Sequence, residues 1–306
     1  MSDAAATADT GESVDRFGIT GALVAVTAWG LSGVISKHID MGGIAIAAYR
    51  FVAYFLALSI FMHLRGTRIT VRMLRLSLWG GLALGVDVAL FFSAVKHTSV
   101  ANATIVGALQ PVLVAIVAHR FFGERIRPRD IGFGSIALVG AVVVVLNAAD
   151  STKTDITGDI FAVGALFAWA AYFIFSKLAK GKLTGNEYTI GSAFWVGVTN
   201  VPLAFLFGQD MSWPSAESWM WLLILAFGAG IMGHSIMNWA IQQIPLWVGS
   251  TFTLFIPPVA AFSAWIFLGE QLTATQMVAM AVVVLALGGV VAGQASIGNR
   301  PRPLRR

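Results

Sequence analysis

The chain has 306 residues, of which 57% are hydrophobic and only 11% are charged. Ordinary soluble domains are about half apolar and about a quarter charged, so this chain has too little polar surface to face water on all sides. It contains no cysteine, which excludes disulfides and thiolate metal sites. Its formal net charge is +5, but the basic residues lie in separate segments and do not gather on one soluble face. This distribution argues against a nucleic-acid-binding protein.

Apolar runs long enough to cross a bilayer, which takes roughly 20 residues, predict ten transmembrane helices. In chain order they are 18–37, 43–64, 74–95, 99–119, 130–148, 158–178, 187–207, 218–240, 247–268 and 275–294. The runs are continuously apolar, so they do not read as the alternating strands of a membrane barrel. The sequence therefore predicts an all-α polytopic membrane protein with short loops.

The N-terminal leader carries acidic residues where a secretory signal would carry Lys or Arg, so we expect residues 1–16 to be a short disordered cytoplasmic tail. If the N-terminus lies inside, sixteen Lys and Arg residues fall in inner segments and three, Lys37, Lys96 and Lys153, in outer segments. Arg50 is the remaining one and lies within the second span. This positive-inside bias predicts that both termini are cytoplasmic.

Two segments of the first half of the chain return in the second half. AWGLSGVISK at 28–37 returns as AWAAYFIFSK at 168–177, and QPVLVAIVAHRFFGE at 110–124 returns as IPPVAAFSAWIFLGE at 256–270. Two matches in the same order, at similar separation, indicate a duplicated five-helix unit. The domains expected from it are a first repeat at 17–148, an outer linker at 149–157, a second repeat at 158–294 and a basic cytoplasmic tail at 295–306.

Five is an odd number of spans, so the second copy is expected to enter the membrane with the opposite orientation. Inverted repeats around a central cavity are the architecture of many secondary transporters, in which the two halves exchange packing to open a central site to either side. The competing interpretation is that the duplication only builds a stable membrane scaffold.

These motifs resemble the EamA-type transporters of the drug/metabolite transporter superfamily. The resemblance covers 17–294 and rests on ten helices, two tandem five-helix units, a fourth helix in each unit with an early Pro and a terminal Gly-Glu, and AAYRFVAYF at 47–55, which is similar to the family's second helix. Within the superfamily the chain is similar to the bacterial aromatic-amino-acid exporter branch. This implies a monomeric inner-membrane protein without a cofactor that exports amino acids, aromatic or otherwise neutral, or related small metabolites.

Two charged residues stand inside predicted spans, Arg50 in the second and Asp87 in the third. Both are expected roughly 10 to 12 Å from the outer ends of their helices, from the helical rise of about 1.5 Å per residue. Asp87 could bind a substrate ammonium group or titrate as a proton-coupling site. Alternatively, the two residues form a structural ion pair, or Arg50 extends outward to the interface.

The eighth span reads FGAGIMGHSIMNWAIQQ and places His234 and Asn238 four residues apart, on one helix face. A histidine with a near-neutral pKa could bind a carboxylate or relay a proton. Both side chains could equally do no more than hydrogen-bond neighbouring helices.

Aromatic and amide side chains complete the candidate substrate site. Trp169 and Tyr172 share a face of the sixth helix, Phe91 follows Asp87 by one turn, and Asn102 lies in the fourth helix. The alternative for the aromatic residues is that they fill helix interfaces or face lipid. Proline can bend a membrane helix, so hinge or gating positions are predicted at Pro111, Pro257 and Pro258.

The sequence also bears on other functions. No Gly-rich phosphate loop ending in Gly-Lys-Ser or Gly-Lys-Thr is present, which argues against direct use of ATP, and neither HExxH nor GxSxG occurs, so we do not expect an enzyme. Nucleotide-sugar or sugar-phosphate exchange should favour cationic groups deep in both halves. Efflux of lipophilic cationic drugs would suit one carboxylate with aromatic walls. A scaffold or sensor without substrate flux is the alternative outside transport.

Overall fold

The computed structural model describes residues 16–97, 100–148 and 155–298, and these residues form helices joined by short turns. The elements are α1 (Arg16–Ser36), α2 (Gly43–Leu64), α3 (Val71–His97), α4 (Val100–Gly107), α5 (Gln110–Phe122), α6 (Pro128–Ala148), α7 (Ile156–Leu178), α8 (Gly185–Leu206), α9 (Ala216–Leu225), the π-helix η1 (Ala226–Ser235), α10 (Ile236–Gln243), α11 (Leu246–Thr251), the 3₁₀-helix η2 (Phe252–Phe255), α12 (Ile256–Leu268) and α13 (Ala274–Gly298). They make ten stretches long and apolar enough to span a membrane, which confirms the predicted fold class. Most of the two predicted tails, and most of the predicted linker, lie outside the described residues.

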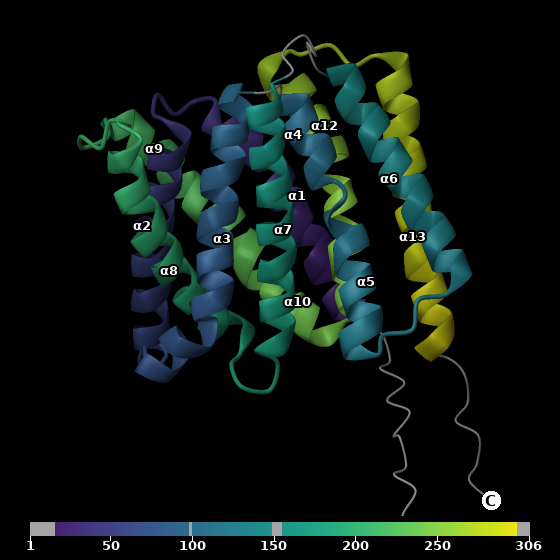
Figure 1. Ribbon diagram of the computed structural model, residues 1–306, viewed down its shortest axis with the longest axis horizontal. Coiled ribbons are helices and arrows are strands. Elements are labelled where there is room, and N and C mark those ends of the chain that lie inside the picture. The colour runs from purple at the N-terminus through teal and green to yellow at the C-terminus, as the bar shows by residue number, and fades with distance from the viewer. Residues whose placement is uncertain (1–15, 98–99, 149–154, 299–306) are drawn as a thin grey trace, which may run out of the picture.

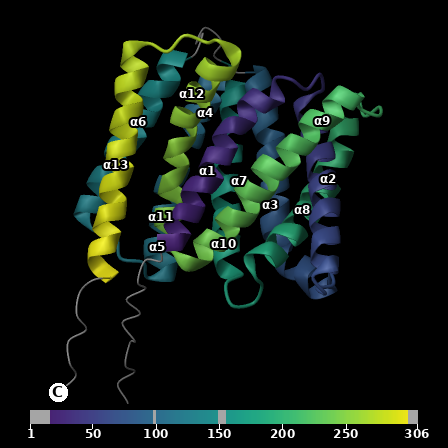
Figure 2. The ribbon, with the colours of Figure 1, turned by 180° about the vertical axis from the view of Figure 1, so that it is seen from behind.

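The spans stand side by side in one bundle (Figures 1 and 2). Because their number is even, α1 begins and α13 ends at the same end of the bundle, at the bottom of Figure 1. We call this end the terminal face, and the end at which α1 finishes and α13 starts the opposite face. Helices from the two halves of the chain interlock: α3 packs along α7 and α8, and α1 packs along α10 and α12.

A seam of glycines lets α3 approach α8 closely. A Cβ atom on Gly81 would lie 2.6 Å from Cβ of Trp195 and 3.0 Å from Cα of Ser192, and one on Gly85 would lie 2.9 Å from the Thr199 side chain. In lipid, helices associate mainly through such close packing, because there is no water to expel. The glycines therefore fix the contact between the two halves.

This seam gives a prediction with a matched control. Gly81→Ala is expected to destabilise the protein by about 1 to 3 kcal/mol, because the added methyl group meets backbone and Cβ atoms that cannot rotate away. Gly132→Ala in α6 adds the same methyl group where nothing lies within 4 Å, so it should be neutral or slightly stabilising through helix propensity. Denaturation of both variants in detergent measures the difference. Equal stability of the two variants would contradict the role of the seam.

The fourth and ninth spans are interrupted near the prolines that were predicted to act as hinges. The fourth span breaks between α4 and α5, and the ninth between α11 and α12, with proline in the first turn of α5 and of α12. Proline has no N–H, and its ring clashes with the carbonyl four residues earlier, so it kinks or breaks a helix. The structure thus has a break at Pro111 and at the Pro257–Pro258 pair, while their role in gating is still a prediction.

The same two spans end in an identical way. Gly123 follows α5 with φ 65°, and Gly269 follows α12 with φ 70°, a left-handed conformation that only glycine adopts at little cost. The next residue in each case donates its N–H back to the helix, Glu124 to Ala118 and Glu270 to Ala264. The Gly-Glu motif therefore stops each helix and sets the direction of the glutamate.

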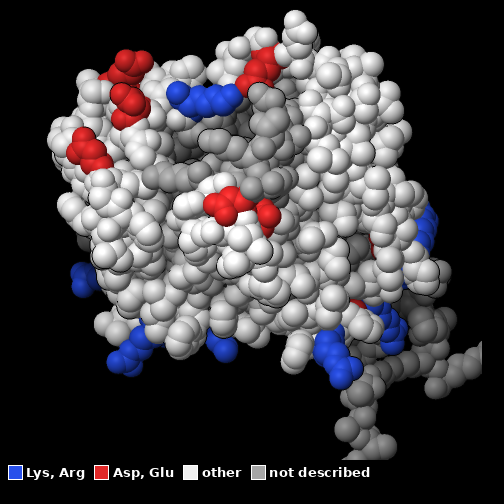
Figure 3. All heavy atoms as spheres, turned by 45° about the horizontal axis from the view of Figure 1, so that its top comes forward, with Lys and Arg blue, Asp and Glu red and all other residues white. Residues whose placement is uncertain are grey.

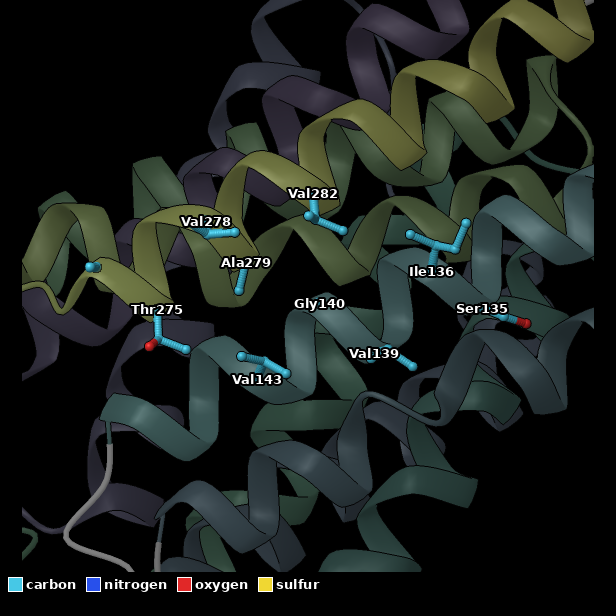
Figure 4. A pocket seen from close by; sticks show the side chains of 10 residues that line it. Ser135, Ile136, Val139, Gly140, Val143, Thr275, Val278, Ala279 and Val282 are labelled. Carbon is cyan, nitrogen blue, oxygen red and sulfur yellow. The ribbon is translucent and has the colours of Figure 1, made fainter.

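Many large apolar side chains are exposed along the outside of the bundle, as expected for residues that face lipid. On this outer surface a groove of about 710 Å³ runs between α6 and α13 (Figure 4). Valines, alanines and Ile136 line it, with Ser135 and Thr275 as its polar residues, and it contains no charged side chain. It therefore fits an acyl chain of the surrounding lipid better than a polar substrate.

Candidate functional site

The helix that carries His234 is widened into a π-helix over Ala226–Ser235. π-Helical segments are rare and occur often at functional sites. Two glycines of this segment bring aromatic rings close: Gly233 lies against the Trp29 indole and Gly230 against the Tyr54 ring. The indole Nε1 of Trp29 donates to the carbonyl of Ala229, 3.2 Å away. The glycines thus allow α1 and α2 to pack against the backbone beside His234.

Three aromatic rings surround the buried imidazole of His234. Ring centroids lie 5.2 Å away for Trp29, 5.5 Å for Phe51 and 5.9 Å for Tyr172. The Nδ1 atom of His234 is 3.5 Å from the Tyr172 hydroxyl. These residues come from α1, α2, α7 and η1, so the structure brings His234 and Tyr172 together at the centre of the bundle, as their candidate roles require.

Asn238 has all of its side-chain polar atoms engaged. Its Nδ2 donates to the Tyr172 hydroxyl at 2.7 Å and to Thr189 Oγ1 at 2.8 Å, and its Oδ1 accepts from Ser176 Oγ at 2.8 Å. The residue is fully buried. This pattern corresponds to interhelical bonding among α7, α8 and α10, so Asn238 holds Tyr172 in place and has no remaining donor for a substrate.

Arg50 and Asp87 do not form the predicted ion pair. Among the residues that the structure describes, neither side chain has an ion-pair or hydrogen-bond partner, and Nε of Arg50 is buried without one. The Arg50 guanidinium lies over the Phe51 ring, 4.7 Å from its centroid, and this ring lies 5.5 Å from that of His234. Asp87 lies on α3, which packs along α7, the helix that carries Tyr172. Arg50 is therefore next to the aromatic cluster around His234, and Asp87 is on a helix that packs against the same cluster.

Leaving two charges unpaired inside a membrane span is unfavourable by about 2.5 to 3.5 kcal/mol each on insertion scales. Both residues are partly exposed, although Nε of Arg50 is buried. By the bounds of their helices, Arg50 lies about 10 Å from the start of α2 and Asp87 about 15 Å from the end of α3. Both helix ends belong to the opposite face, so the charges sit well inside the bundle.

The remaining predicted site residues are Trp169, Phe91 and Asn102. Trp169 is partly exposed and joins the aromatic cluster, 6.5 Å from Trp29 and 6.1 Å from Phe173 between ring centroids. Phe91 packs elsewhere, against a small cluster formed by Ala94, Ala103 and Ala162. Asn102 lies in α4, and its side chain is outside the described part of the chain. The structure thus gathers Trp169 with His234 and Tyr172, and places Phe91 apart from them.

A buried ion pair that the site predictions did not include closes the terminal face. Nζ of Lys177 lies 3.4 Å from Oε1 of Glu124 and donates to the carbonyls of Ile241 and Ile244 at 3.2 and 2.8 Å. The Glu124 carboxylate also accepts from the backbone N–H groups of Leu246 and Trp247, at 2.7 and 3.1 Å. The ends of α5, α7 and α10 and the start of α11 therefore meet at one buried point.

The corresponding pair lies on the opposite face. Nζ of Lys37, after α1, is 2.6 Å from Oε1 of Glu270, after α12. The side chains are 59% and 49% exposed here, against 7% for Lys177 and 9% for Glu124. Lys37 is the hydrogen-bond and ion-pair partner of Glu270 within the described residues, and no backbone N–H of a helix start docks on that carboxylate. The two faces are thus built from the same pair but closed to different degrees.

The sequence did contain a signal for these pairs. The repeats match Lys37 with Lys177 and Glu124 with Glu270. Each repeat therefore has one such lysine and one such glutamate at the ends of its spans. Since the matching ends lie on opposite faces, the cation of one repeat can meet the anion only across the two halves. The described residues hold no group of His, Asp and Glu side chains that could bind a metal ion.

Comparisons with known proteins agree with this architecture. The model of the EamA-like transporter family matches the chain twice, at residues 16–146 and 156–292. The threonine/homoserine exporter RhtA of Escherichia coli strain K12 is 26% identical over 212 residues, covering 69% of either chain. A probable amino-acid metabolite efflux pump of Salmonella typhimurium strain LT2 is 25% identical over 281 residues, covering 87% of this chain and 91% of that protein.

A solved crystal structure of a protein at 19% sequence identity has the same fold, with a TM-score of 0.74 over 94% of this chain and 98% of the other. The two matches to the family model together span most of the chain and separate it into two repeated halves. The chain belongs to the EamA-like transporter family.

Proposed function

We propose that this protein is a secondary transporter that exports neutral amino acids or related small metabolites across the bacterial inner membrane by alternating access. The observation that carries the proposal is the unequal closure of two equivalent ion pairs. On the terminal face, α11 docks on Glu124 and the pair is buried, while on the opposite face the Lys37–Glu270 pair is exposed. The amino-acid exporters among its relatives support the same substrate class.

The charge distribution supports an orientation. Basic residues near the terminal face and acidic residues on the opposite face agree with a cytoplasmic terminal face under the positive-inside rule. Figure 3 brings the opposite face forward and shows acidic side chains around it, with basic side chains at the other end. In this orientation the conformation is closed to the cytoplasm and open to the outside.

Access would alternate through the two helix starts. The offset of 146 residues that relates Glu124 to Glu270 also relates Leu246, at the start of α11, to Val100, at the start of α4. In the inward-open state, α11 leaves Glu124 and α4 docks on Glu270 in its place. The two Lys–Glu pairs serve as fixed anchors, and the helix breaks beside Pro111 and Pro257 let the helix starts move.

Counterflow by the purified protein in proteoliposomes tests the proposed function. Vesicles loaded with unlabelled phenylalanine, threonine or homoserine should accumulate the same labelled amino acid, in a purified system without ATP, at two pH values that reveal any proton coupling. Uptake of an aromatic ammonium dye with indifference to amino acids would favour efflux of lipophilic cations. Absence of any flux would favour a scaffold or sensor.

A further inference from the structure

Arg50 and Asp87 are opposite charges inside the bundle that do not pair with each other. Each is a partly exposed charge inside a span and, in the described structure, has no ion-pair or hydrogen-bond partner. The two carry opposite signs, and the helices that carry them meet at one cluster. Arg50 lies over the Phe51 ring, which is 5.5 Å from His234, and His234 is 5.9 Å from Tyr172 on α7, along which the helix of Asp87 packs. A site with one free cation and one free anion fits a ligand that carries both opposite charges.

We propose that Arg50 and Asp87 form a two-point site for the zwitterionic backbone of an amino acid, a specificity that rests on the proposed transport function. Arg50 takes the substrate carboxylate, because its guanidinium presents several N–H donors in a planar fork that matches carboxylate geometry. Asp87 takes the ammonium group through charge-assisted hydrogen bonds. His234 and Tyr172 belong to the buried cluster that packs against the Phe51 ring below Arg50.

The aromatic residues near the two charges indicate which kind of substrate side chain the site accepts. Trp29 and Trp169 are partly exposed and lie edge to face, Phe173 packs beside both of them, and Phe51 packs beside His234. These rings provide an apolar wall without a charge of either sign. A third charge on the ligand would have to be desolvated against this wall with no counterion, so lysine and glutamate are disfavoured relative to neutral amino acids.

Substrate analogues distinguish the roles of the two charges. Phenethylamine keeps the ammonium group and lacks the carboxylate, whereas 3-phenylpropionate keeps the carboxylate and lacks the ammonium group. Wild-type protein should bind phenylalanine more tightly than either analogue by about 10- to 100-fold, since each analogue leaves one charge of the site unpaired inside the bundle. Arg50→Gln should abolish the preference over phenethylamine, and Asp87→Asn the preference over 3-phenylpropionate.

The matched control for Arg50 is Arg65, which ends the same helix and lies over the Phe61 ring at 5.2 Å, but on the terminal face. Arg65→Gln should keep the full wild-type preference. The matched control for Asp87 is Asp155, an exposed carboxylate that caps α7 by accepting the N–H of Thr157. Asp155→Asn should likewise leave the preference intact, because asparagine caps helices equally well.

Ligand-dependent thermal stabilisation of the purified proteins gives the binding ratios, and counterflow gives the transport. Preferences are ratios measured within one variant, so they do not depend on how much active protein each preparation contains. If Arg50→Gln does not fold, Arg50→Met removes the same charge. Wild-type counterflow of phenylalanine together with unchanged preferences in Arg50 and Asp87 variants would overturn the two-point site and leave the proposed function standing. Absence of amino-acid counterflow in the wild type would overturn the proposed function itself.

Discussion

Lys177→Met is expected to destabilise the protein by about 3 to 5 kcal/mol, the loss typical of removing one partner from a buried ion pair. The Glu124 carboxylate would then stay buried without its cation, and the carbonyls of Ile241 and Ile244 would lose their donor. Chemical denaturation in detergent, followed by the fluorescence of the ten tryptophans, measures the change.

The repeat supplies an internal control for this prediction. Lys37→Met removes the equivalent cation on the opposite face, where both side chains of the pair are about half exposed. An exposed ion pair contributes about 0 to 1 kcal/mol, so Lys37→Met should change stability little. The double variant Lys177→Met with Glu124→Gln leaves no buried charge and should recover part of the loss. Similar losses for Lys177→Met and Lys37→Met would contradict the assigned difference in burial.

Much of the fold follows from the sequence because membrane-spanning helices depend on local properties. A run of about 20 apolar residues must be helical in lipid, since every backbone polar group needs an internal partner. All ten spans could be placed on this ground, and two of the helix breaks fall beside proline. The π-helix at Ala226–Ser235 has no comparable local signal beyond its three glycines.

The site was harder to predict because it depends on which side chains meet across the halves. His234 and Tyr172 were chosen for their chemistry and do lie together. The predicted Arg50–Asp87 pair is not formed, because Arg50 lies over the Phe51 ring of its own helix and α3, which carries Asp87, packs mainly along α7 and α8. The position of a residue along its helix gives its depth in the membrane. It does not give the rotation of the helix about its axis, so it does not tell which neighbouring helix the side chain faces. Lys177 and Glu124 could have been paired only by combining the repeat with the positions of the helix ends.

Single cysteines at equivalent serines are expected to report opposite changes in access when the terminal face is opened. The natural chain has no cysteine, so each introduced thiol reacts alone. Ser36 lies beside the exposed Lys37, whereas the equivalent Ser176 is fully buried and donates to Asn238. In an otherwise wild-type background, a membrane-impermeant maleimide should label Ser36→Cys quickly from the opposite face and Ser176→Cys slowly from the terminal face.

Glu124→Gln should reverse this order. The substitution removes the carboxylate on which the start of α11 docks, and a loss of about 3 kcal/mol shifts the balance between the two states by about 100-fold. Ser176→Cys should then react faster and Ser36→Cys more slowly. The test depends on the two labelling rates changing in opposite directions. Local loosening of the terminal face would accelerate labelling at Ser176→Cys without slowing it at Ser36→Cys. Since the two serines belong to equivalent helices, opposite changes in their labelling require that closure on one face and opening on the other are a single transition.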